Sequence, residues 1–107
     1  MNKYTELSDF EVNKKVAEKS GLAYEVTRYG VVTRMSNKEQ WREFNPCNNP
    51  ADAMPIIIEN KIGLSPMYHS NKWTADCLDY DFISVNKNPL RAAMELFLLM
   101  KDAENEG

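Results

Sequence analysis

Apolar residues recur at spacings of three and four positions between residues 89 and 103, which is the pattern of an α-helix. Asn88 and Pro89 mark its start, because asparagine suits the N-cap and proline suits the first helical position. The apolar residues that cover most of its circumference are Leu90, Ala93, Met94, Leu96, Phe97, Leu99 and Met100. This pattern predicts a helix that the rest of the chain, or another subunit, must cover on more than one side.

Another helix is predicted from about Asp9 to Lys19. Ser8 is followed three residues later by Glu11, which is the pattern of a capping box. Ser20-Gly21 predicts its end, because glycine tolerates the left-handed conformation of a helix stop. Asn13 falls near the middle of the broad apolar face. We expect its amide to hydrogen-bond to a neighbouring loop or strand backbone, because a buried polar group needs a partner.

The segment from residue 24 to residue 44 combines strand and helix signals. β-Branched and aromatic residues flank Tyr29-Gly30, which predicts a β-hairpin over residues 24–35. Ser36 and Glu39 form a second, weaker capping box. We expect it to begin a short helical turn that runs through residues 41–44 until Asn45-Pro46 breaks it.

Residues 48–63 repeat the Asn-Pro opening and predict a further buried helix that ends at Gly63. Asn49 is expected to cap it, and Pro55 either bends it or lies next to its true start at about Met54. The face that we expect to be buried consists of Ala53, Met54, Ile57, Ile58 and Ile62.

Residues 64–85 lack helical periodicity and contain several β-forming residues. They predict one strand around Trp73 to Leu78 and another near Tyr68 or between Phe82 and Val85. Together with the helices, these strands predict the α+β class, as a small sandwich of about three helices on a mostly antiparallel sheet of three to four short strands. The 107 residues suit a single domain, 1–107, and the charged end, residues 101–107, is expected to fray.

Composition and charge narrow the function classes. With 43% hydrophobic residues and a net charge of -3, the chain is globular and has no basic excess that would favour nucleic acid. The N-terminus lacks an apolar signal core, and the longest apolar run, Leu96 to Met100, is too short to cross a bilayer. We therefore expect no membrane partner and a cytoplasmic protein. Cys47 and Cys77 match neither a metal-binding spacing nor a disulfide framework, so we expect reduced thiols.

Three stretches carry a resemblance to a known family: Glu6-Leu-Ser-Asp-Phe-Glu-Val-Asn13, residues 48–60 from Asn-Asn-Pro to Ile-Glu-Asn, and Asn88-Pro-Leu-Arg-Ala-Ala-Met94. With them the chain resembles, over its whole length, the NinX family of small proteins from lambdoid bacteriophages and prophages. Relatives often have Trp or Gly where this chain has Met54. The resemblance implies an origin in the accessory genes of a temperate phage and an uncharacterised role in the bacterial cytoplasm, and it supplies no catalytic residues.

Sequence motifs that would indicate catalysis, nucleotide binding or metal binding are weak in this chain. GxGxxG, GxxxxGK[ST], GxSxG and HExxH are all absent. Cys47 and His69 lack an orienting third group, so we interpret them as a loop cysteine and a surface histidine. Asp76, Asp79 and Asp81 lack the glycine and distal glutamate of a calcium loop, so we interpret them as a solvated acidic turn. We therefore expect no enzyme activity, no catalytic residue, no metal and no cofactor.

Our leading hypothesis is a phage accessory protein that acts by non-enzymatic protein-protein interaction. It would form a homo-oligomer, in the simplest case a dimer, and bind a host or phage protein. Leu98 and Met100 are the residues that we place at the oligomer interface, because the C-terminal helix is apolar on nearly all sides.

The first alternative is a small-ligand binding protein that holds a nucleotide or metabolite at a subunit interface. Its candidate contacts are Tyr68, Trp73 and Arg91. An ion pair between Arg91 and Glu95, one helical turn apart, explains the arginine equally well without a ligand.

The second alternative, which we favour less, is binding of single-stranded nucleic acid. Arg28, Arg34, Trp41 and Arg42 interleave cations with an aromatic ring, as such a surface requires. Three nearby glutamates nearly balance this charge, whereas phosphate contact needs clustered positive charge. Trp41, like Trp73, also suits the role of a core anchor.

Overall fold

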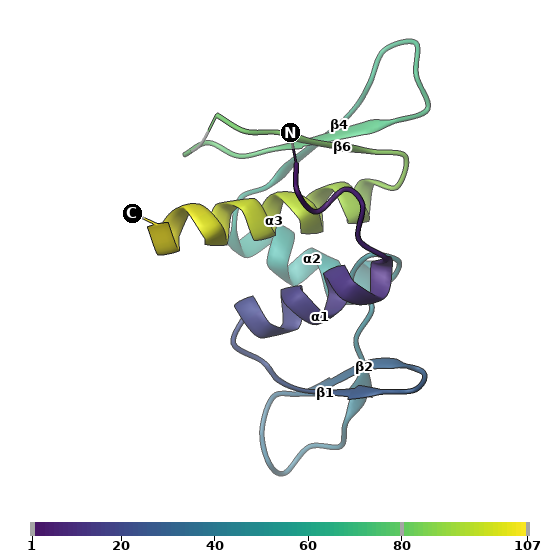
Figure 1. Cartoon of the computed structure of the whole chain (residues 1–107), viewed down its shortest axis with the longest axis vertical. Helices are drawn as coiled ribbons and strands as arrows, with labels where there is room; N and C mark the ends of the chain where they lie inside the picture. Colours follow the sequence, from purple (N-terminus) through teal and green to yellow (C-terminus); the bar gives the residue numbers. More distant parts are fainter. Residues whose placement is uncertain (1, 80, 107) are drawn as a thin grey trace.

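The computed structural model describes residues 2–79 and 81–106. Within these residues the elements are, in chain order, α1 (Asp9–Lys19), β1 (Ala23–Thr27), β2 (Gly30–Arg34), β3 (Arg42–Glu43), α2 (Pro50–Glu59), β4 (Gly63–Pro66), β5 (Trp73–Asp76), β6 (Ser84–Asn86) and α3 (Pro89–Glu106). The helices lie together in the middle, and a small antiparallel sheet lies on either side of them (Figure 1). The predicted α+β class is confirmed.

Helix α1 begins and ends as its sequence predicts. The Ser8 hydroxyl accepts from the Glu11 N–H at 3.1 Å, and the Glu11 carboxylate accepts from the Ser8 N–H at 3.2 Å, which confirms the capping box. Just after the helix, Gly21 adopts a φ of 78°, a conformation that glycine takes without steric cost. Val12 and Val16 are fully buried, so α1 contributes one apolar face to the core.

Strands β1, β2 and β3 form the first sheet, in that order. The predicted hairpin is confirmed: β1 and β2 pair antiparallel with Val26 opposite Val31, and a tight turn joins them at residues 28–29. Helix α1 packs against both strands. Val31 is buried, whereas Val26 on the outer strand is half exposed, so β2 contributes more to the core than β1 does.

The short helical turn predicted through residues 41–44 is wrong, because this segment is extended and includes β3. Phe44 donates its N–H to the Val31 carbonyl at 2.8 Å, which continues the pairing of β3 with β2. The Ser36 hydroxyl accepts from the backbone N–H of Lys38 instead of from that of Glu39, so the expected cap does not form. Pairing with the neighbouring strand therefore overrides a weak local helix signal.

Strands β4, β5 and β6 form the second sheet, where one sheet in total had been expected. Leu64, Ala75 and Ser84 lie opposite one another in adjacent strands, and Ala75 and Ser84 are buried against α3. The predicted strand at Trp73 is confirmed as β5, and the one near Val85 as β6. Tyr68 instead lies in the loop between β4 and β5.

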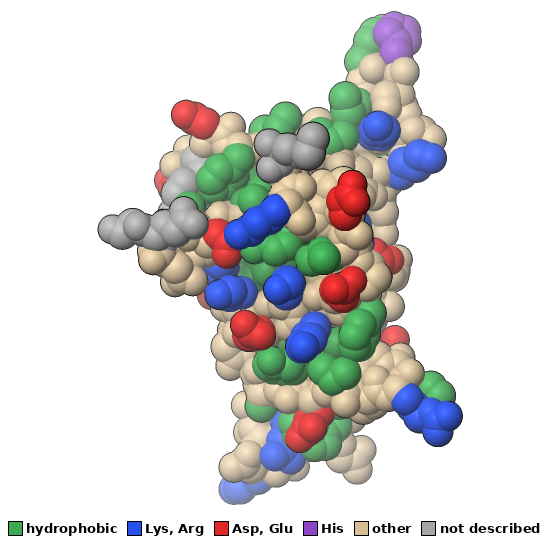
Figure 2. All heavy atoms as spheres, viewed as in Figure 1, with side chains coloured by type: hydrophobic (Ala, Val, Ile, Leu, Met, Phe, Trp, Pro, Cys, Tyr) green, Lys and Arg blue, Asp and Glu red, His purple; other side chains and the backbone are tan. Residues whose placement is uncertain are grey.

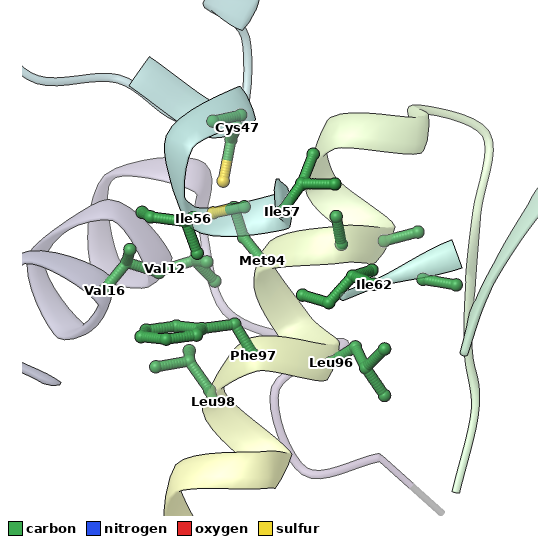
Figure 3. Close-up of a cluster of buried hydrophobic side chains, with 14 of the residues drawn as sticks. Val12, Val16, Cys47, Ile56, Ile57, Ile62, Met94, Leu96, Phe97 and Leu98 are labelled. Carbon is green, nitrogen blue, oxygen red and sulfur yellow. The ribbon is translucent and has the colours of Figure 1, made fainter. Parts of the chain in front are cut away.

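Helix α3 is the centre of the core (Figure 3). It contacts α1, α2 and all strands of the second sheet, which explains why its sequence is apolar on nearly all sides. Met94, Leu96, Phe97 and Leu98 are at most 2% exposed. Asn88 caps the helix as predicted, because its side chain accepts from the Leu90 N–H at 2.9 Å.

The end of α3 differs from the expected fraying. The helix continues through the charged segment to Glu106, and Gly107 lies outside the described residues. Tyr4 donates its hydroxyl to Asp102, and Lys3 forms an ion pair with the same carboxylate at 3.1 Å. The N-terminal segment thus holds the last turns of the helix in place.

Helix α2 is capped by Asn49 as predicted, since the asparagine side chain accepts from the Ala51 N–H at 3.0 Å. The expected buried face is only partly correct. Ala53, Ile57 and Ile62 are buried, whereas Met54 is 40% exposed and Ile58 is 68% exposed. The reason is that α2 packs chiefly against α3 along one side, so its opposite side faces solvent.

Candidate functional site

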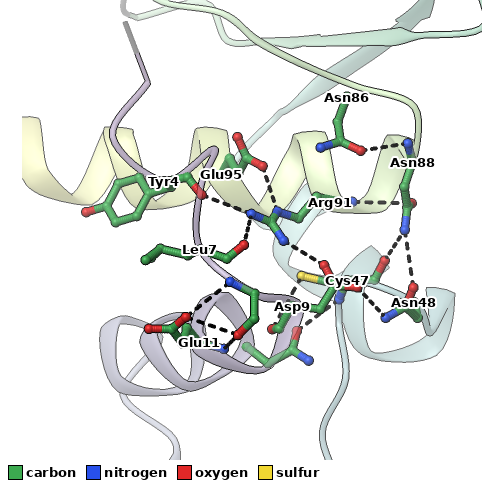
Figure 4. Close-up of polar contacts among 12 residues, drawn as sticks. Tyr4, Leu7, Asp9, Glu11, Cys47, Asn48, Asn86, Asn88, Arg91 and Glu95 are labelled. Carbon is green, nitrogen blue, oxygen red and sulfur yellow. Dashed lines mark hydrogen bonds and ion pairs between the residues drawn. The ribbon is translucent and has the colours of Figure 1, made fainter.

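Arg91 lies in a buried polar junction between α3 and the N-terminal segment (Figure 4). Its Nε donates to Glu95 at 2.6 Å, and one terminal nitrogen donates to Asp9 at 2.6 Å. The other terminal nitrogen donates to the carbonyls of Tyr4 and Leu7, at 2.9 and 2.7 Å. The predicted pair of Arg91 with Glu95 is confirmed.

The charge of Arg91 is well stabilised in this junction. Burial opposes it, but the carboxylates of Asp9 and Glu95 raise the pKa of the guanidinium above its ordinary value. Because each guanidinium nitrogen already has an acceptor within the chain, Arg91 holds the N-terminal segment on α3 and has little capacity left for a ligand.

Asparagine side chains join the N-terminal ends of the helices (Figure 4). Asn88 donates to the Cys47 carbonyl at 2.6 Å, and Asn48 donates to the Asp9 carboxylate at 3.1 Å. Asn13 donates to Asn45 at 2.8 Å and accepts from the Cys47 N–H at 3.1 Å, which confirms the expected bond to a neighbouring loop. The stretches that carry the family resemblance therefore meet in one hydrogen-bonded junction.

Cys47 is an unreactive thiol in this fold. Burial, followed by the nearby Asp9 carboxylate, raises its pKa from the ordinary 9.0 to about 12, and the thiolate is the nucleophilic form. His69 lies in the exposed loop between β4 and β5, stacked edge-on against Tyr68. The structure does not bring the cysteine and the histidine together. Within residues 2–79 and 81–106, moreover, no three His, Cys, Asp or Glu side chains are placed to hold a metal ion.

The three predicted ligand contacts do not share a site. Tyr68 is 88% exposed at the tip of the β4–β5 hairpin, which projects at the upper right of Figure 1 and carries the histidine coloured purple in Figure 2. Trp73 is the first residue of β5, directly after the loop, and is paired with Pro66 and Asn86. Arg91 is buried and faces the N-terminal segment. A common ligand for these three residues has no geometric support.

The predicted nucleic-acid contacts separate into two groups. Arg34 lies 4.4 Å from the centre of the Trp41 ring, and Arg42 lies on the adjacent strand opposite Thr33. Arg28 lies at the other end of the β1–β2 hairpin, 5.4 Å from the Tyr29 ring. Because Arg34 covers a face of Trp41, that face is not open for a base to stack on.

Leu98 and Met100 lie in the core of the chain itself, with 1% and 5% of their surface exposed. They pack within the monomer, where α3 is already covered by α1, α2 and the second sheet. These residues are therefore not available on the surface for a subunit interface. An interface on α3 was expected because its apolar surface must be covered. In the structure, other parts of the same chain already cover that surface.

The exposed apolar helix face lies on α2 instead. Ala51, Met54, Pro55 and Ile58 are all exposed and project from one side of the helix, at about 100° per residue. We call these four residues the α2 surface. Apolar side chains that are exposed singly are normal, but adjacent ones on one helix face are typical of an interaction site.

A groove of about 310 Å³ adjoins the α2 surface, between α2 and the first sheet. Its apolar lining consists of Leu22, Met35, Phe44, Ala51, Pro55 and Ile56. Charged residues at this groove come from both walls: Arg34 and Arg42 from the sheet side, Asp52 and Glu59 from α2, and Glu39 from the loop after β2. The α2 surface thus continues into a concave region of mixed character.

The carboxylates and guanidinium groups at this α2 groove form no ion pairs with one another among the described residues. Glu39 accepts from the Met35 N–H at 3.1 Å, and Asp52 accepts from the Asn45 N–H at 2.9 Å. Neither Arg34 nor Arg42 forms an ion pair with a carboxylate among the described residues. The buried Nε of Arg34 also has no acceptor there. Arg34 donates one terminal N–H to the Asn37 side chain at 3.3 Å and lies over Trp41, so Arg42 and the remaining terminal N–H groups of Arg34 are available to an incoming carboxylate.

A second cleft, of about 390 Å³, lies where α1 begins, beside the β1–β2 turn. Its lining includes the aromatic side chains of Phe10 and Tyr29, the charged groups of Arg28 and Glu43, and the amide of Asn45. The volume is within the range of small-ligand pockets, which is about 300–1,000 Å³. None of the three predicted ligand contacts lines it.

These features define a small α+β protein with a closed polar junction inside and an apolar helix face outside. In the described part of the chain, no helix combines the length and the apolar character that crossing a membrane requires. A family model described as Bacteriophage P22, NinX matches residues 3–101, so the chain belongs to the NinX family of bacteriophage proteins. A search of curated proteins found no match.

Proposed function

We propose that this NinX protein is a non-enzymatic accessory factor that acts by protein-protein contact through the α2 surface and its groove. The observation that carries the proposal is the unbroken apolar character of the exposed side of α2, from Ala51 through Met54 and Pro55 to Ile58. Burying such a surface against a partner is favourable, because it removes apolar area from water.

The partner is a phage or host protein in the bacterial cytoplasm, or a second copy of the chain. Family membership supports the phage context, since the match spans residues 3–101. The mixed charges around the groove favour a protein over a nucleic acid, because phosphate contact needs clustered positive charge. Arg34 and Arg42 would provide specificity at the edge of an apolar contact.

Site-specific photo-crosslinking in infected cells tests this proposal. A photoreactive phenylalanine analogue at position 58 is expected to give a light-dependent protein adduct, because the Ile58 side chain is 68% exposed on the α2 surface. The matched control carries the same analogue at position 83, where Ile83 is 55% exposed just before β6. Adducts at neither position, or equal adducts at both, would contradict a contact surface on α2.

Small-ligand binding is a second candidate, supported by the cleft of about 390 Å³ at the start of α1. Phe10 and Tyr29 offer aromatic surface there, and Arg28 and Asn45 offer hydrogen-bond donors. A thermal-shift screen with nucleotides and metabolites tests it, because a ligand that binds only the folded state raises the melting temperature. Absence of a shift with every compound counts against this candidate.

A further inference from the structure

We propose that the occupant of the α2 surface is a second copy of this chain, bound with the two α2 helices antiparallel. This inference rests on the proposed contact function and adds the identity of the partner. It follows from the order of side-chain sizes on the exposed face, in which small or flat residues alternate with large ones: Ala51, Met54, Pro55 and Ile58.

The α2 surface is complementary to itself about a two-fold axis. An axis that passes between residues 54 and 55 relates Ile58 of one copy to Ala51 of the other, and Met54 to Pro55. Each large side chain then meets a small or flat one, which lets two helices approach closely and interdigitate. A self-complementary patch of this kind is what a closed two-fold dimer requires.

The charges beside the α2 surface fit the same arrangement. The proposed two-fold axis is perpendicular to α2 and lies in the plane of the contact between the two helices. It therefore places the groove-facing flanks of both α2 helices on the same side of the dimer. Glu59 lies on that flank and is exposed. It would therefore approach the wall that carries Arg34 and Arg42 of the other copy, which form no ion pair with a described carboxylate of their own chain.

Disulfide trapping tests this geometry. Ala51→Cys and Ile58→Cys are each introduced into a background in which Cys77 is replaced by serine, while the buried Cys47 is kept. Across the proposed contact, residues 51 and 58 lie opposite each other, within the roughly 4.4–6.8 Å between Cα atoms that a disulfide needs. Two copies of residue 58 are instead separated by about 10 Å along the helix axis, at a rise of about 1.5 Å per residue.

A mixture of the two single variants should therefore give a covalent dimer under mild oxidation, and each variant alone should stay monomeric on a non-reducing gel. Circular dichroism verifies that the variants are folded, as expected for exchanges at exposed positions. Absence of the mixed dimer in folded protein, or equal cross-linking of a single variant with itself, would overturn the inference. If photo-crosslinking at position 58 captures a different protein while the mixed dimer does not form, the contact function stands and self-association fails.

Discussion

Arg91 and Glu95 form an ion pair one turn apart in α3, with 2.6 Å between Nε and the carboxylate oxygen, and Glu95 is fully buried. Such a pair is not by itself evidence of high stability, because removing two charges from water is costly. Its structural consequence is specific, since the same guanidinium also binds Asp9 and the carbonyls of Tyr4 and Leu7. The pair thus fixes the path of the N-terminal segment across α3.

Arg91→Met should destabilise the protein strongly. The change leaves Glu95 buried without its cation, and removing one partner of a buried ion pair costs about 3–5 kcal/mol. Chemical denaturation followed by circular dichroism measures the change in unfolding free energy. The control is Lys101→Met, which removes the exposed pair with Glu104 on the same helix and should cost less than about 1 kcal/mol. Equal effects of the two variants would show that the buried junction has no special role.

Cys47 should make the fold sensitive to alkali. Burial raises the pKa of its thiol from 9.0 to about 12, so the folded state disfavours the thiolate. This contribution to stability is complete below about pH 9 and is lost as the pH rises from about 9 toward about 12. Cys47→Ala should therefore show a shallower fall in unfolding free energy between pH 8 and pH 10.5 than the wild type, in denaturation measured at each pH. Parallel curves would exclude Cys47 as the titrating group.

Asn13→Leu should cost about 1–3 kcal/mol, because it leaves buried polar groups without partners. The side chain of Asn13 bonds to Asn45 and to the N–H of Cys47, so its loss affects the loop before α2. Urea denaturation measures the cost. Asn71→Leu, at an exposed position in the β4–β5 loop, is the matched control and should change stability by less than about 0.5 kcal/mol. A similar cost at both positions would contradict the role of the buried amide.

Single-stranded DNA should not retain the protein, even at about 50 mM salt, where phosphate contacts are strongest. The cations predicted for this role are divided between the two ends of the β1–β2 hairpin, and Arg34 lies against Trp41. Retention on a DNA column, measured against salt, tests this expectation. Elution that shifts strongly with salt, and that is lost in a variant with Arg34→Gln and Arg42→Gln, would reinstate the nucleic-acid hypothesis.

Local signals were sufficient to predict the helices. The capping box at Ser8, the Asn-Pro openings and the helix stop at Gly21 each act within a few residues, so they can be recognised without tertiary structure. The β1–β2 hairpin has the same local character. By contrast, residues 36–44 carried a helix signal that pairing with Val31 overrides, and such pairing depends on a distant strand.

Our sequence analysis expects the interface on α3, whereas the exposed apolar helix face lies on α2, because the two helices are similar in sequence pattern. Both are apolar on nearly all sides, and periodicity alone does not tell which one the chain encloses. Length offers one signal: α3 has 18 residues and contacts α1, α2 and the second sheet, whereas α2 has 10 residues and packs chiefly against α3. The groove and its arginines, which form no ion pair with a described carboxylate, depend on tertiary contacts, so the sequence alone does not reveal them.

Native mass spectrometry of the wild type and of Ile58→Glu is the most direct test of the α2 surface as a contact site. We predict a dimer for the wild type and a monomer for Ile58→Glu, because a carboxylate packed against Ala51 of the other copy would be buried without a partner. The control Ile83→Glu, which lies outside the α2 surface, should remain a dimer. A dimer that survives Ile58→Glu in folded protein, or a wild type that is monomeric throughout the concentration range, would contradict self-association through α2.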